Sequence, residues 1–417
     1  MTQDSPTAAA RSGTPGFAEF VALIAILMAL QALGIDVMLP ALPTIGRALA
    51  ITDATRQQWI IAAYIAGMGA GQLVWGILAD RYGRRPIMLI GVALYMVAAA
   101  LSALAQSEVP LLLFRFAHGA AAASAVVCRS VVRDLYSGRQ MARVMSLTFI
   151  VFLIVPVLAP SVGQLILLWL PWRWTFGCCA IAAALMLAWA ALRLPETLHP
   201  EYRLTITPEH VLHSMRVVIT DPVSIFHTLA MTLMFGWLVA YVSSVQQIYA
   251  TVFHRPELMP AMFALCASSM GVTSWLNARL VERLGMRVIG HGALLAFIAV
   301  ALLHTILANM APESMTSFVI FQAVSLACLG LVSGNFGTMA MEPLAAIAGI
   351  GAALQGFITS VGAAILGALI GAQFNGTTAP LAAGALGVGI ATLLLVLLAE
   401  RGRLFRPHHA DAQLPLH

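Results

Sequence analysis

Two charged side chains lie inside long apolar segments of this 417-residue chain. Asp36 is embedded in Leu33–Pro43, and Arg115 is embedded in Leu111–Ala121. Desolvation favours the protonated form of a carboxyl group, whereas a nearby arginine favours its ionised form. A carboxyl group under both influences can exchange its proton near neutral pH. We therefore predict that Asp36 binds and releases a proton; the alternative is that it caps a helix end four residues before Pro40.

Arg115 and His118 form the second set of candidates. Burying an arginine in a bilayer costs about 2.5–3.5 kcal/mol on insertion scales, so it persists only where a cavity or a counter-charge offsets that cost. Arg115 lies about six residues inside its segment, roughly 9 Å deep at about 1.5 Å per residue. We therefore expect a cavity or a counter-charge beside Arg115, with His118 one turn further along the same segment. The alternative is that Arg115 extends to the membrane interface.

The elements that position these residues are predicted from composition. The chain is 60% hydrophobic and 9% charged, whereas about a quarter of the residues of a soluble domain are charged. Apolar stretches of about 20 residues recur, and this length crosses a bilayer core of about 30 Å as a helix. We predict an all-α polytopic membrane protein with twelve spans, near 17–40, 57–79, 86–106, 109–133, 141–167, 173–194, 223–250, 259–281, 288–309, 313–339, 348–374 and 379–400.

The longest polar gap divides the spans into two groups of six. We predict a disordered tail at 1–16, a six-helix bundle at 17–194, a linker at 195–222, a second six-helix bundle at 223–400 and a tail at 401–417. The chain has no lysine, and 17 of its 22 arginines fall in loops on the side of the N-terminus, four on the opposite side and Arg115 within a span. Since arginine-rich loops stay in the cytoplasm, we predict that both termini are cytoplasmic.

Several functional classes are disfavoured by what the chain contains. All five cysteines fall in or at the ends of apolar segments, and no known metal-binding spacing occurs. We therefore expect no metal and no cofactor other than protons as the coupling ion. The arginines are dispersed among loops, so a nucleic-acid partner is not expected. Neither a nucleophile–base pair nor a metal cluster is evident, so we do not expect an enzyme.

An ordered charged string, Gly76–Pro86, joins the second and third predicted spans. Glycine at 76 allows close approach of backbones, and Gly83 can turn with positive φ. Asp80 can accept hydrogen bonds from neighbouring arginines or face a helix N-terminus. The alternative is that the string only anchors the loop in the cytoplasm. The segment 282–287 echoes 80–85 at an offset of 202, which indicates two repeats related by an axis along the membrane normal.

The fifth predicted span carries a second motif. Pro156 and Pro160 remove backbone donors at i and i+4 and bend the helix. Ala159 and Gly163 are small enough to let another helix lie close. The corresponding span of the second half has a glycine ladder, for which we expect a packing role; its members are Gly356, Gly362, Gly367 and Gly371.

These motifs together resemble a known family. The string at 76–86 resembles the loop between helices two and three of the Major Facilitator Superfamily, and Leu111–Ala121 resembles its fourth-helix motif. With the segments at 129–136, 194–198, 341–343 and 355–357, the chain resembles the bicyclomycin/chloramphenicol-resistance (Bcr/CflA) branch of twelve-span drug:proton antiporters. Two residues depart from the family pattern, since His118 replaces the usual glutamine and Ala159 replaces the usual glycine.

The resemblance implies the Major Facilitator fold, with twelve helices in two six-helix bundles. It implies that the fourth-helix arginine, Arg115, takes part in proton transfer, with His118 either a further proton-coupling residue or a hydrogen-bonding substitute for glutamine. It also implies that the fifth-helix motif supports antiport. It also implies a latch that holds the two halves in the outward-facing state, formed by Gly76, Asp80, Arg81, Gly83, Arg84, Arg85, Arg133 and Asp134.

Exporters of this branch take lipophilic, mostly neutral or cationic compounds. The resemblance therefore implies multidrug efflux by proton-coupled antiport with alternating access, in a bacterial inner membrane. The alternative is a carrier for a small metabolite, either proton-coupled or facilitative. We expect a lipophilic drug-like substrate, protons and membrane lipids as partners, and a monomer. The predicted substrate cavity is lined by Gln31, Tyr64, Met68, Tyr241, Gln246, Asn335 and Gln355.

Overall fold

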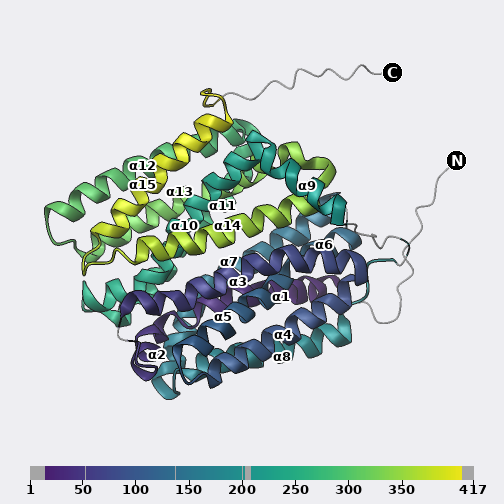
Figure 1. Ribbon diagram of the computed structural model, residues 1–417, viewed down its shortest axis with the longest axis horizontal. Helices are drawn as coiled ribbons and strands as arrows, with labels where there is room; N and C mark the ends of the chain where they lie inside the picture. Colours follow the sequence, from purple (N-terminus) through teal and green to yellow (C-terminus); the bar gives the residue numbers. More distant parts are fainter. Residues whose placement is uncertain (1–14, 52, 137, 200, 202–207, 406–417) are drawn as a thin grey trace.

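The computed structural model describes residues 15–51, 53–136, 138–199, 201 and 208–405. Within these residues every regular element is a helix, and the long helices lie roughly parallel to one another (Figure 1). Eleven described helices are long and apolar enough to cross a membrane. The fifth predicted span corresponds to helix α7 (Gly138–Trp169), whose segment Ile154–Trp169 is apolar but shorter than these eleven. The prediction of an all-helical membrane protein is confirmed.

The first bundle contains the six predicted spans of the first half. Its elements are α1 (Phe17–Asp36), η1 (Leu39–Ala41), α2 (Leu42–Ala48), α3 (Ala54–Tyr82), α4 (Arg84–Leu104), α5 (Glu108–Ala122), η2 (Ala123–Ala125), α6 (Val126–Leu135), α7 and α8 (Arg173–Arg193). Helix α4 packs on α5 and α8, and α1 packs on α7. An ion pair of 2.6 Å between Glu19 and Arg193 joins the start of α1 to the end of α8.

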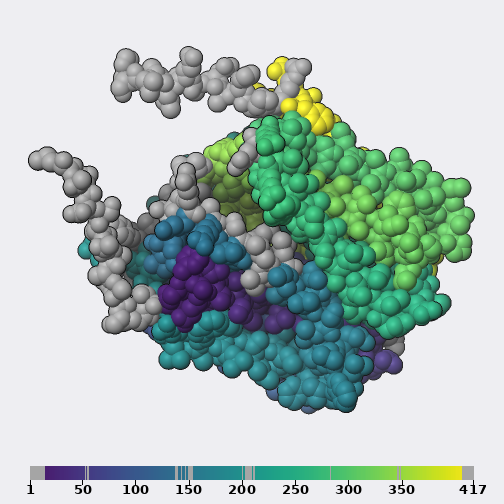
Figure 2. Space-filling model, turned by 180° about the vertical axis from the view of Figure 1, so that it is seen from behind, coloured from purple at the N-terminus to yellow at the C-terminus, as the bar shows by residue number. Residues whose placement is uncertain are grey.

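The second bundle repeats this arrangement. Its elements are α10 (Pro222–Thr251), η4 (Pro256–Leu258), α11 (Met259–Leu284), α12 (Met286–Met310), α13 (Met315–Met341), η5 (Glu342–Ile347), α14 (Ala348–Gly371) and α15 (Ala379–Ala399). Helix α10 packs on α14 and α15, and α12 packs on α13 and α15. Figure 2 shows the same division on the surface, with purple-to-teal atoms in one part and green-to-yellow atoms in the other.

Two predicted spans are broken into shorter helices. In the first span, α1 ends at Asp36, and after two turn residues Leu39 begins the short helix η1, of which Pro40 is the second residue. The break follows from the chemistry of proline, which has no N–H group to continue the helical bonding. The fourth span is similarly divided into α5, η2 and α6. The spans predicted at 17–40 and 109–133 as single helices are thus each divided into shorter helical segments.

The seam between the bundles is formed mainly by α3 and α14. A Cβ atom on Gly69 would lie 2.8 Å from the Val361 side chain, so the two helices are in close contact there. Nearer one end of the seam, the Gln58 amide donates to Ser244 Oγ at 3.4 Å and to Gln247 Oε1 at 3.2 Å. These hydrogen bonds join the first and second bundles directly.

The glycine ladder of α14 packs on both bundles. Gly356 and Gly371 face the side chains of Gln72 and Gln58 on α3. Gly362 and Gly367 face α10, against Thr232 and Val239. These contacts agree with the predicted packing role, because each position lacks room for a larger side chain.

The region predicted as a linker contains a helix, α9 (Pro208–Thr220). Its Val218 is fully buried in a small apolar cluster with Leu344 and Leu354. Leu73 of α3 packs on the same cluster, so α9 lies against residues of both bundles. A spacing of four between the buried Ser214 and Val218 is the helical signal that the sequence analysis missed.

Candidate functional site

Arg115 lies at the centre of a fully buried cluster in the first bundle. Its Nη1 is 3.0 Å from His118 Nδ1, and its Nε donates to the backbone carbonyl of Ile60 at 3.3 Å. The guanidinium carbon lies 4.3 Å from the centre of the Tyr64 ring and 5.4 Å from that of Phe176. Arg115 therefore faces inward, not toward the membrane interface. Aromatic faces and one backbone carbonyl offset part of the cost of burying its charge.

Two tyrosines of this cluster hold the last turns of α1. The Tyr64 hydroxyl donates to the carbonyl of Gln31 at 2.9 Å, and the Tyr95 hydroxyl donates to the carbonyl of Leu30 at 2.8 Å. The His118 ring packs edge-on against both, with centroid distances of 5.2 Å to Tyr64 and 4.2 Å to Tyr95. The arginine cluster is thus connected to the backbone just before Asp36. The sequence analysis did not predict the role of Tyr95.

Asp36 is the last residue of α1 and is 5% exposed. In the part of the chain that the structure describes, its carboxylate makes no ion pair with Arg115 or with any other cation. We expected Arg115 to act on Asp36 as a nearby charge. The two residues are instead linked indirectly, through Tyr64 and the end of α1.

The fifth-helix motif contacts the break that follows Asp36. A Cβ atom on Gly163 of α7 would clash with the carbonyl oxygen of Val37 and would lie 3.3 Å from Pro40 Cδ. Glycine is therefore required for α7 to approach this turn so closely. Pro156 and Pro160 lie inside α7, and Ala159 is buried. The structure thus brings together two features that were predicted separately.

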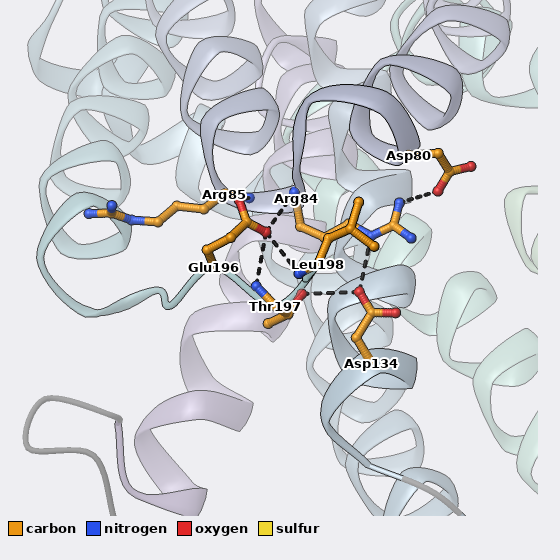
Figure 3. Close-up of polar contacts among 7 residues, drawn as sticks. All are labelled: Asp80, Arg84, Arg85, Asp134, Glu196, Thr197 and Leu198. Atoms are coloured by element: carbon orange, nitrogen blue, oxygen red, sulfur yellow. Dashed lines mark hydrogen bonds and ion pairs between the residues drawn. The ribbon is translucent and has the colours of Figure 1, made fainter. Parts of the chain in front are cut away.

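A second polar cluster lies at the junction of α3 and α4 (Figure 3). The buried Arg84 guanidinium pairs with Asp80 one turn earlier and with Asp134 of α6 at 3.0 Å. Thr197 Oγ1 donates to the same Asp134 carboxylate at 3.1 Å. Gly83, at φ 106°, makes the turn that starts α4. Because a residue with a side chain rarely adopts this φ, glycine is needed there.

Glu196 closes this cluster from the end of α8. Its carboxylate accepts from the backbone N–H groups of Arg84 at 2.9 Å and Arg85 at 3.3 Å. It also accepts from the N–H groups of Thr197 and Leu198. A carboxylate at this position satisfies the free donors of the first turn of α4 and matches its dipole. Glu196 and Thr197 had not been assigned to the latch.

Three other residues of the predicted latch are Arg81, Arg133 and Gly76. Arg81 and Arg133 are exposed, and the Arg81 guanidinium lies over the Tyr82 ring at 5.2 Å. A Cβ atom on Gly76 would meet nothing within 4 Å, so this glycine makes no close approach in this conformation. The polar contacts of Arg84 and Asp134 lie within the first bundle. In this conformation these contacts stabilise the first bundle, and a latch between the two halves stays a prediction.

The seven predicted cavity residues are distributed over both bundles. Tyr64 bonds the backbone of Gln31, as described above. In the second bundle the buried Asn335 donates to Asn277 Oδ1 at 2.8 Å. Tyr241 stacks on Phe263 with centroids 5.9 Å apart.

The remaining cavity residues vary in burial and contact. Gln246 is buried and Met68 is half-buried. The Gln355 amide nitrogen lies 3.7 Å from Met231 Sδ. A cavity of about 510 Å³ lies elsewhere, lined by residues that include Thr251, Glu313 and Thr378. A substrate site at the predicted positions stays a prediction.

Comparison with known proteins identifies the family. The family model for the Major Facilitator Superfamily matches residues 24–367. The chain belongs to the Major Facilitator Superfamily. This family consists of transporters, and the chain is accordingly a multi-pass membrane protein.

Relatives place the chain near drug-resistance members of this superfamily. It is 30% identical over 367 residues to the uncharacterised MFS-type transporter YdgK of Bacillus subtilis (strain 168), covering 86% of this chain and 89% of that protein. It is 27% identical over 368 residues to a bicyclomycin resistance protein homologue of Haemophilus influenzae, covering 87% and 91%. It is 29% identical over 318 residues to a chloramphenicol resistance protein of Pseudomonas aeruginosa, covering 73% and 74%.

Solved structures confirm the Major Facilitator fold. The partially occluded inward-open xylose transporter XylE from E. coli superposes with a TM-score of 0.71, covering 94% of this chain and 99% of that chain at 14% identity. At this identity the similarity shows the fold alone. The predicted resemblance to the Bcr/CflA branch is likewise confirmed by the relatives.

The second half of this Major Facilitator protein has its own charged cluster at the predicted repeat. Arg287, at the start of α12, pairs with Glu400 at 3.0 Å and with Glu342 at 3.1 Å. Two buried histidines, His227 and His291, lie beside Glu400. No local spacing signals this group, because its members are separated by 64 and 109 residues of sequence.

Proposed function

We propose that this protein is a drug:proton antiporter of a bacterial inner membrane, which exports lipophilic compounds by alternating access. The names of the bicyclomycin- and chloramphenicol-resistance relatives support the substrate class. One structural observation carries the coupling proposal, which is the burial of Asp36 at the end of α1, beside a helix break.

Asp36 is placed to link protonation with helix geometry. A buried carboxyl group with no cationic partner is most stable when it is neutral, because an unpaired charge is costly in an apolar medium. Ionisation therefore requires water, a substrate cation or a rearranged helix end. The break between α1 and η1, at Val37 and Met38, allows such rearrangement because the regular helix ends at Asp36. Loss of the proton would thus accompany a change in the packing of α1 on α7.

The seam of the molecule supports the alternating-access proposal. Contacts between the bundles run along α3 at Gln58, Gly69 and Gln72, whereas a Cβ atom on Gly76 would meet nothing within 4 Å. This arrangement represents one of the two states that alternating access requires. In the second state we propose that α14 approaches Gly76.

The proposal is tested by transport in everted membrane vesicles. Vesicles containing the protein should accumulate a lipophilic dye or antibiotic when a proton gradient is imposed, and an uncoupler should abolish accumulation. Addition of substrate should also discharge the gradient, as measured with a pH-sensitive dye. Each charge moved contributes about 2.3 kcal/mol per 100 mV, so one or two protons drive appreciable accumulation. Transport that persists without the gradient would contradict coupling and favour a facilitative carrier.

A further inference from the structure

Three residues meet at one end of the second bundle. His227 is in the second turn of α10, His291 is in the second turn of α12, and Glu400 directly follows α15. One ligand atom from each lies within 4.8 Å of the others. Their exposed fractions are 0%, 1% and 0%, respectively. This end of the bundle also carries the arginine-rich α11–α12 loop, which the positive-inside rule places in the cytoplasm.

Both histidines leave an Nε2 atom without a partner among the described residues. His227 Nδ1 lies 2.9 Å from the carbonyl of Val223, so this nitrogen carries the proton and donates it there. Its Nε2 therefore has a free lone pair, 3.7 Å from Glu400 Oε1. Buried polar atoms are almost always bonded. Two unsatisfied ring nitrogens beside one buried carboxylate indicate that a ligand belongs between them.

The charges around this point favour a cation. Both carboxylate oxygens of Glu400 accept from Arg287 Nε at 3.0 Å. Arg287 Nη2 donates to the Glu342 carboxylate at 3.1 Å. Two carboxylates, those of Glu400 and Glu342, thus contact one guanidinium. The Phe336 ring packs edge-on against both imidazoles, with centroid distances of 5.5 and 6.2 Å, and fixes their orientation.

We propose that His227, His291 and Glu400 bind a divalent transition-metal cation of the zinc class. Two imidazole nitrogens and one carboxylate oxygen are the ligand types that zinc takes, and three protein ligands leave one position for water. The bond from His227 to the Val223 carbonyl is the outer contact that usually orients a metal-binding histidine. The site is distinct from the proposed proton site at Asp36 and does not depend on the proposed transport function.

Binding at this site is coupled to the end of the described chain. His291 Nδ1 accepts from the backbone N–H of Phe405 at 3.1 Å, so in the metal-free protein its Nε2 carries the proton. A metal ion at Nε2 requires this proton to move to Nδ1 by exchange with water, which leaves the imidazole neutral. Nδ1 can then no longer accept from Phe405. Metal binding is therefore expected to release the backbone contact at Phe405.

The histidine pair is specific to the second half of the molecule. In the first bundle, α4 corresponds to α12. The position five residues after the start of the helix is Leu89 in α4 and His291 in α12. Arg84 in the first bundle is instead paired with the two carboxylates of Asp80 and Asp134. Charge pairing at the repeat therefore does not itself require imidazoles.

The test is zinc binding to the full-length protein. The protein is purified through an affinity tag that contains no histidine, and bound metal is first removed with a chelator. Competition with a chromogenic chelator should show one equivalent of tightly bound Zn²⁺. His227→Gln with His291→Gln should lower the affinity at least about tenfold, the smallest effect expected from disturbing a metal site. The matched control is His408→Gln with His409→Gln, in the tail outside the described residues, which should bind as the parent does.

The contrary results are equally specific. Failure of the parent to bind Zn²⁺, or undiminished binding by the His227/His291 variant, would overturn the proposal. Loss of binding in the tail variant alone would assign the metal to the tail. If the buried variant does not fold, X-ray absorption of the zinc-loaded parent decides. We expect two histidine nitrogens at about 2.0–2.1 Å plus oxygen, and a shell without histidine would contradict the site.

Discussion

At the residue scale, Arg115 shows how a costly charge is accommodated in the first bundle. Its guanidinium contacts His118, the Ile60 carbonyl and the face of Tyr64, but forms no ion pair in the described part of the chain. The sequence predicted that Arg115 is buried, because charged residues inside apolar spans need a polar environment. It did not predict the route through Tyr64 to α1, because that contact joins residues far apart in sequence.

Replacing Arg115 by lysine should separate charge from geometry. Lysine keeps the positive charge but has neither the planar fork that reaches His118 and Ile60 nor the flat face that packs on Tyr64. We expect proton-driven efflux to fall at least about tenfold, equivalent to about 1.4 kcal/mol, with the protein still present in the membrane. Dye efflux normalised to protein amount measures this. Efflux at the parent's level would show that charge alone is sufficient.

At the element scale, the packing of α7 on the break after α1 is the central contact. Gly163 faces the Val37 carbonyl and Pro40 without room for a methyl group. The sequence predicted that α7 has small residues for close packing, but it gave no indication of their partner. A sequence pattern shows which face of a helix carries small residues. It does not identify the helix that packs on that face, because the partner depends on the arrangement of the whole bundle.

Gly163→Ala should therefore destabilise the protein. The added methyl group overpacks a tight contact, for which about 1–3 kcal/mol is typical. Gly387→Ala in α15 is the matched control, since its Cβ atom would meet nothing within 4 Å. Alanine there should be neutral or slightly stabilising because glycine is a poor helix former. Unfolding in denaturant, followed by tryptophan fluorescence, measures both. Equal effects of the two substitutions would contradict the close approach.

The contact of Glu196 with the start of α4 gives a second prediction at this scale. Glu196→Gln removes the negative charge from the N-terminus of α4, and we expect a loss of about 0.3–1 kcal/mol in the free energy of unfolding. The effect should diminish in high salt, because exposed charges are screened. Glu201→Gln, at a side chain that is 78% exposed, is the control. A loss that is the same in both variants would show that the helix contact contributes nothing.

At the scale of the whole molecule, the two bundles meet along α3 and α14. The number of spans, their division into two groups and the repeat at 282–287 were all predicted, because hydropathy and short charged strings are local properties of the sequence. The helix α9, the bonds from Gln58 to α10 and the group around Glu400 were not. These features arise from contacts between distant segments, which no spacing rule describes.

Gly76→Val tests whether α14 approaches Gly76 in the other state. The present conformation has room for the side chain, so the folded state should persist. If α14 approaches Gly76 in the other state, valine should oppose that state and slow transport. Spin labels at positions 135 and 284, both exposed here, should then report a distance distribution that no longer changes with substrate. Gly387→Val is the control, and unaltered switching in Gly76→Val would contradict the proposed closure.

The proposed antiport depends on proton exchange at Asp36. The most direct test of this exchange is to measure proton release when substrate binds. Purified protein is placed in a weakly buffered detergent solution, and the pH is recorded as substrate is added. We predict that the parent protein releases protons in proportion to the substrate bound. Asp36→Asn should release none while remaining folded, and Glu257→Gln, at an exposed side chain, should behave as the parent. Undiminished proton release by Asp36→Asn would contradict the account.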